Sequence, residues 1–217
     1  MNRADLIAMH PTLWHMADPV NKDAILKRGL LSTSALLDLF EITGEERLAI
    51  ESGHRPDSVT IRHAVHGSAV IRDQKPMSLE GLTRSVTDAT PQDYLKFLNG
   101  RVFFWLTEER LKGMTSARAY REHEQLVLKI DTAALVNTHE NRILLSPRNS
   151  GATKPFAWER SIEMFKRIAD YDYAARAQAT DPIVELTVDH SVPDVMSLVE
   201  TLEIWKNGKR VRKVRYN

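Results

Sequence analysis

Hydrophobic and polar positions near the amino end fall into short segments, each bounded by a turn residue. The apolar run Leu13–Met16 stops at Asp18-Pro19, which predicts a buried strand followed by a turn. Asn21 is placed to cap a helix that runs through Arg28, and Gly29 is placed to end it. The pattern therefore predicts a strand, a turn and a helix at the start of the chain.

The next stretch changes from helical spacing to strand-like spacing. Ser34 and Thr43 are predicted to start two helices, and Thr43-Gly-Glu-Glu46 matches a capping box, in which the hydroxyl and the carboxylate each satisfy a free backbone amide. Between Ser58 and Asp73 the apolar residues are mostly β-branched and surround His66-Gly67. This pattern predicts two strands, or a strand and its return.

A helix followed by a central strand is predicted in the middle of the chain. Thr90-Pro91 is a favourable helix start, because proline at the first helical position loses no hydrogen bond, and Asn99-Gly100 ends that helix. Arg101–Leu106 then contains five consecutive apolar residues, which leave no polar face and so predict a strand buried on both sides. Thr107 is predicted to cap a helix running towards Arg121.

The remaining residues predict further strands, a loop, a helix and a hairpin. The strands are Gln125–Ile130, Ile143–Leu145 and Pro182–Val188, the loop is Ser146–Pro155 and the helix is Trp158–Ile168. The last segments, Leu198–Trp205 and Lys209–Tyr216, flank Asn207-Gly208, a pair that suits the positive φ angles of a type I′ turn. We therefore expect one α+β domain over residues 1–217 with a carboxyl-terminal hairpin over 198–217.

Composition supports a single domain and excludes several kinds of chemistry. The chain has 217 residues, 42% of them hydrophobic, which fits one domain at roughly 100–200 residues per domain. It contains no cysteine, so disulfides, thiolate nucleophiles and Cys-ligated metals are excluded. No apolar run approaches the roughly 20 residues of a membrane span, and the first residues do not resemble a secretory signal. We expect a cytoplasmic protein without a membrane partner.

Charge is distributed unevenly although the net charge is +1. The last twelve residues, Lys206–Asn217, contain six basic residues and no acid, so they carry +6 and the other 205 residues sum to −5. A basic hairpin on an acidic body is suited to contact phosphate. The alternative is an edge strand whose lysines and arginines only prevent sheets from pairing edge to edge.

Standard catalytic motifs are absent from the sequence. There is no Walker A sequence, GxGxxG, GxSxG or HExxH. His63 and His66 stand three residues apart but have no carboxylate at ligand spacing, so no metal site is predicted. Glu185 is different, because it alternates with apolar residues in a predicted strand, where an unpaired carboxylate is costly.

Three separated segments together resemble the DarT-like branch of the ADP-ribosyltransferase fold. Leu13–Asn21 followed by Ile25–Ser32 resembles the opening strand with an apolar–His pair, an Asn turn, a helix and a Gly-Leu stop. Val102–Trp105 resembles the aromatic motif of that branch, and Ile183–Pro193 resembles its final motif, with a Glu in an apolar strand followed by Val-Pro. The resemblance implies split mixed or antiparallel sheets flanked by helices, and an enzyme that uses NAD as co-substrate without a metal.

The resemblance also implies roles for particular residues. Glu185 is the catalytic carboxylate near the ribose, His15 bonds the adenosine half, and Asn21 belongs to the same cofactor-binding set. The face of Phe104 or Trp105 packs against nicotinamide. The family usually has Tyr-Phe at these two positions, so this chain lacks a phenol hydroxyl there and keeps only the stacking surface.

An arginine upstream of the aromatic motif completes the expected site. Arg72 is our preferred candidate to hold the pyrophosphate or the transition state, and Arg55 and Arg62 are the alternatives. The resemblance further implies a toxin or phage-defence role and an antidote protein as a partner. It does not fix the acceptor, which we expect to be nucleic acid.

Candidate acceptor-binding residues come from three places in the chain. The polar loop Ser146–Thr153, the aromatic stretch before the Glu185 strand and the basic hairpin contribute Asn149, Ser150, Tyr171, Lys209, Arg210 and Arg212. The loop has an alternative interpretation as a plain connector, and Tyr171 as a core residue.

Two other functions stay open. RNA 2′-phosphotransferases resemble this fold but carry a paired His-Gly and several pocket arginines that the sequence does not reveal. A non-catalytic module that binds nucleic acid through the basic hairpin is the second alternative. It predicts salt-dependent binding that does not require Glu185.

Overall fold

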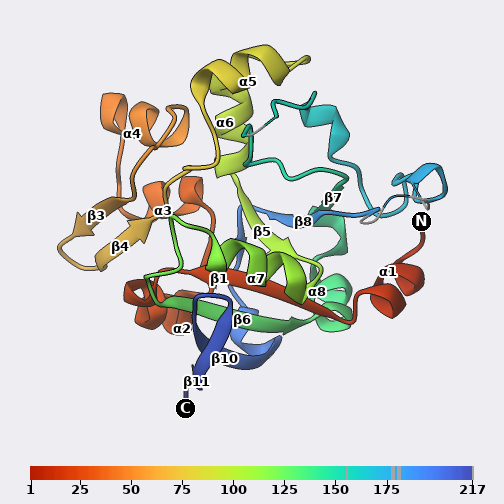
Figure 1. Cartoon of the computed structure of the whole chain (residues 1–217). Coiled ribbons are helices and arrows are strands. Elements are labelled where there is room, and N and C mark those ends of the chain that lie inside the picture. Colours follow the sequence, from red (N-terminus) through yellow and green to blue (C-terminus); the bar gives the residue numbers. More distant parts are fainter. Residues whose placement is uncertain (155, 177–178, 180–181, 217) are drawn as a thin grey trace.

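The computed structural model describes residues 1–154, 156–176, 179 and 182–216 (Figure 1). Pro155, where the expected loop ends, and Asn217, the last residue of the hairpin segment, lie outside the described residues. A central sheet crosses the molecule, and helices lie on both of its faces (Figure 1). Antiparallel sheets flanked by helices give the α+β class that the sequence predicted.

Seven strands form the central sheet, and every neighbouring pair is antiparallel. In spatial order they are β11 (Lys209–Lys213), β10 (Val199–Lys206), β6 (Gln125–Asp131), β1 (Thr12–Ala17), β5 (Arg101–Trp105), β8 (Glu185–Asp189) and β7 (Ile143–Ser146). Two small sheets pair β2 (Leu30–Leu31) with β9 (Ser191–Val192) and β3 (Val59–His63) with β4 (Gly67–Ile71). The predicted central position of β5 is confirmed, because it lies between β1 and β8.

The central sheet is split between β1 and β5. β1 pairs with β6 over six consecutive residues, whereas it pairs with β5 at only one position, where Trp14 faces Trp105. On the far side of β5, all five residues from Arg101 to Trp105 pair with β8. Two well-paired half-sheets therefore meet at a single point of contact, in agreement with the expected split.

Eight α-helices are described, joined by short 3₁₀ turns. They are α1 (Arg3–Met9), α2 (Lys22–Arg28), α3 (Thr33–Leu39), α4 (Gly44–Glu51), α5 (Leu79–Ser85), α6 (Pro91–Asn99), α7 (Glu108–Ser116) and α8 (Thr132–His139). The 3₁₀ turns are η1 (Pro19–Asn21), η2 (Glu140–Arg142), η3 (Ile162–Met164), η4 (Ala174–Arg176) and η5 (Val195–Ser197). α5 and α6 stand above the β5 end of the sheet, and α4 lies with the β3–β4 hairpin at one side (Figure 1).

The two faces of the sheet bury different residues. One face carries Leu13, Phe104, Leu128 and Leu186, which belong to the largest hydrophobic cluster. On the other face α7 covers a smaller cluster that includes the two tryptophans of the Trp14–Trp105 pair. Residues alternate between these two faces along each strand, as predicted for the strand around Glu185. Both faces of the sheet are covered.

Several predicted element boundaries are corrected by the structure. The helix expected at Ser34 begins at Thr33, and Ser32 caps it by accepting a hydrogen bond from the Ala35 amide. Thr43 precedes α4, but its side chain makes no cap hydrogen bond, so the capping box does not form. Asn21 precedes α2 without capping it. In each case the predicted helix forms, but the predicted side chain does not make the capping hydrogen bond.

The largest error concerns the predicted helix Trp158–Ile168. Within it only the short turn η3 is helical. The backbone instead bonds across the fold, with Lys166 exchanging hydrogen bonds with Leu145 and the Arg160 amide donating to the Ser85 carbonyl oxygen. These tertiary backbone bonds replace the bonds that a helix would have made. The helix expected to approach Arg121 likewise ends earlier, at Ser116.

Three helices were not predicted, and the β8 strand starts late. The helices are α1, α5 and α8, which are seven or eight residues long. β8 begins at Glu185 rather than at Pro182. The hairpin turn is as predicted, because Asn207 and Gly208 have φ angles of 48° and 71°. Among the described residues, no helix has the length and apolar character needed to cross a membrane.

Candidate functional site

His15 lies at the split between the two half-sheets. Its Nδ1 is 2.8 Å from the carbonyl oxygen of Phe103, and because a carbonyl only accepts, the ring donates from Nδ1. The His15 side chain thus links β1 to β5 at a place where the two strands are not paired through their backbones. Burial lowers the pKa of His15 to about 4, so the ring is neutral at pH 7 and Nε2 can accept a hydrogen bond.

The aromatic residues beside His15 have different environments. The Phe104 ring centroid lies 5.6 Å from that of His15, but Phe104 is only 1% exposed and belongs to the hydrophobic core. Phe104 therefore has no exposed face for stacking in this structure. Trp105 is partly exposed and remains the candidate for that role.

Strand register brings Trp105 and Glu185 together. Trp105 faces Trp14 on one side and Glu185 on the other, and Glu185 also faces Ser146 on β7. Opposed residues of antiparallel strands share a face, so these four side chains start from the same face of the sheet. His15 follows Trp14 and starts from the opposite face, and its ring reaches Phe103 across the split. Two strand spacings separate β1 from β8, or about 10 Å.

Glu185 is a buried carboxylate, and the loop that follows β7 covers it. Glu185 is 6% exposed, and the Ser150 amide lies 3.1 and 3.3 Å from its two oxygens. Burial raises the pKa of Glu185 to about 7, although the hydrogen bonds from Ser150 and the charges of Arg110 and Arg160 act in the opposite direction. Near neutral pH this carboxyl group can therefore take up or release a proton.

The loop after β7 is fixed at both ends. The Ser146 hydroxyl accepts a hydrogen bond from the Arg148 amide, and the amides of Thr153 and Lys154 both donate to the Pro76 carbonyl oxygen. Ser150 is 3% exposed, whereas Asn149 is exposed and its side chain bonds the Gly151 amide. Of the expected acceptor-binding residues, these two lie next to Glu185.

Arg72 lies close to His15. The positive charge of Arg72 contributes to the lowered pKa of His15, after burial. Its guanidinium stacks over the Tyr120 ring at 4.9 Å, and the Tyr120 hydroxyl donates to Asp73 at 2.5 Å. Within the described part of the chain the Arg72 guanidinium makes no hydrogen bond, so its donors are available to an anionic ligand.

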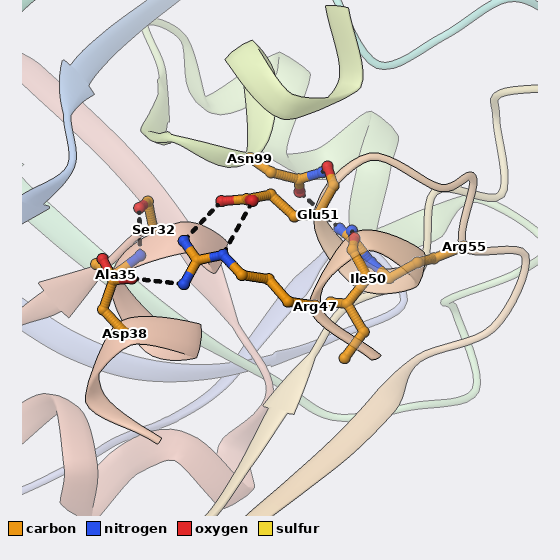
Figure 2. A network of polar contacts seen from close by, with 8 residues as sticks. All are labelled: Ser32, Ala35, Asp38, Arg47, Ile50, Glu51, Arg55 and Asn99. Atoms are coloured by element: carbon orange, nitrogen blue, oxygen red, sulfur yellow. Dashed lines mark hydrogen bonds and ion pairs between the residues drawn. The ribbon is translucent and has the colours of Figure 1, made fainter. Parts of the chain in front are cut away.

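The two alternative arginines are placed differently. Arg55 is 6% exposed and donates to the Ile50 carbonyl oxygen and to Asn99 Oδ1, within the network that Figure 2 shows. In the same view Arg47 bridges Asp38 and Glu51. Arg55 thus holds α4 against α6, and Arg62 is exposed on the β3–β4 hairpin. Arg72 is the candidate that faces His15.

Asn21 has its polar atoms engaged by the backbone. Its amide nitrogen donates to the Val70 carbonyl oxygen and its oxygen accepts from the Val70 amide, both at 2.8 Å. It lines a cavity of about 70 Å³ together with His15, Arg28 and His66. Asn21 therefore holds β4, and with it Arg72, beside this cavity.

The remaining expected residues are not brought to Glu185. Tyr171 is 3% exposed and donates its hydroxyl hydrogen to the Pro182 carbonyl oxygen, which agrees with its alternative interpretation as a core residue and not with stacking an acceptor base. Lys209, Arg210 and Arg212 lie on the exposed edge strand β11. Five strand spacings separate β11 from β8, or about 24 Å.

Sequence reasoning missed several residues of this site. Arg110 and Arg160 act on Glu185 through their charges, and Tyr94 of α6 interacts with Arg160. Phe156 and Trp158 are exposed by 65% and 60%. The aromatic spacing of Phe156-Ala157-Trp158 is the available signal, but the sequence analysis used only Trp158, as the start of the predicted helix. In the described ranges, no group of three or more metal-ligating side chains could hold a metal ion.

Comparisons with known proteins give one family and a distant structural likeness. A model of a family of unknown function (DUF7002) matches residues 11–199. No curated protein matches the chain. Among solved structures, DarT from Thermus sp. 2.9 in complex with NAD+ is similar over 91% of this chain and 83% of that chain, at 12% identity and a TM-score of 0.42.

Proposed function

We propose that this chain, which belongs to the family of unknown function DUF7002, is an NAD-dependent ADP-ribosyltransferase. In this proposal it cleaves NAD between nicotinamide and ribose and passes ADP-ribose to a macromolecule, with nucleic acid as the preferred acceptor. A cytoplasmic toxin or phage-defence role with an antidote protein partner belongs to the same proposal and follows from the sequence resemblance.

The observation that carries the proposal is the arrangement around the split in the sheet. Trp105 is the only β5 residue paired with β1, and it also faces Glu185. His15 starts from the opposite face of the sheet, bonds the Phe103 carbonyl oxygen across the split and lies near Arg72. A neutral imidazole, a guanidinium with unused donors, an aromatic ring and a carboxylate that titrates near pH 7 therefore lie around one junction of strands.

This set of side chains suits the chemistry of glycosidic bond cleavage. When the bond between nicotinamide and ribose C1″ breaks, its electron pair leaves with nicotinamide and positive charge develops on the ribose. An ionised Glu185 stabilises that charge. The acceptor nucleophile then bonds to C1″, and its proton passes to Glu185 or to solvent.

The other residues bind and orient the dinucleotide in this proposal. His15 Nε2 accepts a hydrogen bond from a hydroxyl or amide of the adenosine half, and the Arg72 guanidinium contacts the pyrophosphate. Trp105 packs against nicotinamide. The cavity beside His15 measures about 70 Å³, well below the roughly 300–1,000 Å³ of typical ligand pockets, so we expect NAD to move the surrounding segments apart.

Nicotinamide release tests the proposal. Purified protein is incubated with NAD and candidate acceptors, and Glu185→Gln is compared with wild type. The matched control is Glu203→Gln, because Glu203 is also a 6% exposed carboxylate on a strand of the same sheet but bonds Trp205 instead. We expect Glu185→Gln to lose at least about 100-fold in rate. Equal rates for wild type and Glu185→Gln would reject the catalytic role.

A second candidate reaction is favoured by the arginines near Glu185. Arg110 and Arg160 lie close enough for their charges to lower the pKa of this carboxyl group, and such groups suit the 2′-phosphate that an RNA 2′-phosphotransferase recognises. Formation of ADP-ribose cyclic phosphate from 2′-phosphorylated RNA would identify this reaction. Transfer of intact ADP-ribose to an acceptor would identify the first.

A further inference from the structure

We propose that Arg148, which lies in the loop that covers Glu185, and Trp158 form a binding site for a phosphate group attached to a planar ring, as in a nucleotide. The site would lie at the acceptor side of the proposed active site, and its catalytic meaning rests on the proposed function. Its binding can be measured without turnover, so the two proposals can fail separately.

Arg148 has a buried guanidinium nitrogen, Nε, without a hydrogen-bond partner among the described residues. The guanidinium carbon lies over the Trp158 ring, 5.9 Å from its centroid, and no described carboxylate forms an ion pair with Arg148. The buried Nε has therefore lost its hydration without gaining a hydrogen-bond partner, which is unfavourable for a charged group.

Arg160 adds a second positive charge at the same place. It is 3% exposed and donates to the Ser85 hydroxyl and to the Ala152 carbonyl oxygen, while its Nε has no partner. Burial lowers the pKa of Arg160, and the nearby charge of Arg148 acts in the same direction. The positive charges of the two guanidiniums therefore act on one another.

Among the described residues, Glu185 is the carboxylate whose charge acts on Arg160. Since the pKa of Glu185 is about 7, its carboxyl group is only about half ionised at neutral pH. The group of side chains consequently holds more positive than negative charge in a largely buried environment. An anion would remove the imbalance, and phosphate matches the guanidinium fork in charge and geometry.

The ring component is inferred from Phe156 and Trp158. They are the exposed aromatic side chains of the described residues, at 65% and 60%, and their ring centroids are 5.8 Å apart at 55°. Because Arg148 stacks on Trp158, a phosphate on Arg148 would place an attached ring over this aromatic pair. Stacking of a planar base on such rings contributes without base-specific contacts.

Binding measurements separate the phosphate from the ring. Inorganic phosphate, adenosine and AMP are titrated against wild type, Arg148→Gln, Arg148→Lys and Trp158→Ala, with calorimetry as the readout. Arg84→Gln is the matched control, because Arg84 is an exposed arginine of α5 that pairs with Glu80. We expect Arg148→Gln to weaken phosphate and AMP at least tenfold, and Arg148→Lys and Arg84→Gln to weaken them less.

Trp158→Ala tests the stacking part. It should weaken AMP at least fivefold and leave inorganic phosphate within twofold of wild type. Unchanged phosphate affinity in Arg148→Gln overturns the phosphate site. Equal losses of phosphate and AMP in Trp158→Ala overturn the ring contact. Thermal unfolding of each variant without ligand identifies any that fail to fold. If Arg148→Gln does not fold, the ligand affinities of Arg148→Lys, which keeps the charge, are compared with those of wild type.

The source of the phosphate is distinguished by two further ligands. ADP-ribose represents the dinucleotide and a short single-stranded oligonucleotide represents an acceptor. Weaker binding of only the oligonucleotide in Arg148→Gln assigns the site to the acceptor, and weaker binding of only ADP-ribose assigns it to NAD. Glu185→Gln should lose turnover yet bind phosphate at least as tightly as wild type, which separates this proposal from the catalytic one.

Discussion

The Ser150 amide donates to both carboxylate oxygens of Glu185, and the two distances are 3.1 and 3.3 Å. The loop that follows β7 thereby covers the carboxylate on which the proposed chemistry depends. Since Glu185 is 6% exposed, the proposed reaction requires this contact to open before a ribose hydroxyl or an acceptor reaches the carboxylate. The same contact adjusts the acidity of Glu185.

We predict that Ser150→Ala raises the pH at which nicotinamide release is half-maximal. Burial raises the pKa of Glu185 to about 7, and the Ser150 side chain opposes that shift by bonding the ionised form. Loss of the hydroxyl should therefore move the midpoint above that of wild type, with activity rising as Glu185 ionises. The pH–rate profile measures this, with Ser197→Ala as a control on a distant turn. A lower midpoint in Ser150→Ala would contradict the assignment.

The pH dependence of stability should reveal two opposing groups. Glu185 has its pKa raised from 4.5 to about 7, so the native state binds its proton more tightly and stability falls as pH rises from about 4.5 to 7. His15 has its pKa lowered from 6.5 to about 4, so stability falls as pH drops from about 6.5 to 4. Over most of this window the two contributions oppose each other.

Single variants should separate them. Denaturant unfolding between pH 4 and 8 is measured for wild type, Glu185→Gln and His15→Asn. Relative to wild type, Glu185→Gln should gain stability as pH rises through this window and His15→Asn should lose it, each by up to about 1.4 kcal/mol per pH unit. Difference curves that are flat for both variants would show that neither group titrates as described.

Arg72 should control NAD binding rather than stability. Its guanidinium makes no hydrogen bond with the described residues and lies near His15, so Arg72→Gln should raise the KM for NAD about tenfold or more. Arg62→Gln is the matched control, because Arg62 is an exposed arginine of the adjacent strand β3. Steady-state kinetics with NAD measures both. An equal change in the two variants would remove Arg72 from the site.

Arg55 should instead control stability. Arg55→Ala would leave the Ile50 carbonyl oxygen and Asn99 Oδ1 without their donor inside the network of Figure 2. We expect it to lower the free energy of unfolding by about 2–4 kcal/mol, as measured by denaturant titration. Arg84→Ala, at an exposed ion pair, should change it by less than about 1 kcal/mol. A loss of NAD binding in a stable Arg55→Ala protein would argue for Arg55 as a pocket residue.

Much of the fold was predictable because it depends on local pattern. The fully apolar run at Phe103 and Phe104 predicted a strand buried on both faces, and the structure places it inside the sheet, with Phe104 buried and Phe103 partly exposed. Asn207-Gly208 required a tight turn through its positive φ angles. The alternation around Glu185 indicated a buried carboxylate, which the structure describes at 6% exposure. These properties follow from backbone preferences and side-chain period within a few residues.

The failures arose where distant segments compete with local preference. Residues 158–168 have a helical pattern, but their backbone bonds to β7 and to α5 instead. Asn21 was expected to cap a helix, yet its amide pairs with Val70, a residue 49 positions away. A single sequence gives no sign of such partners, because the free energy of each contact depends on segments that only the folded chain brings together.

The sequence by itself, through the resemblance of three of its segments to a known fold, indicated which residues could carry the proposed chemistry: His15, an aromatic pair and Glu185. Only the tertiary structure decided which of them lie together and in what state. Strand register paired Trp105, not Phe104, with Glu185. The split in the sheet lets the His15 side chain reach the Phe103 carbonyl oxygen. The physical reason is that proximity, burial and acidity depend on long-range packing, whereas hydrophobic alternation and turn geometry act within the local chain.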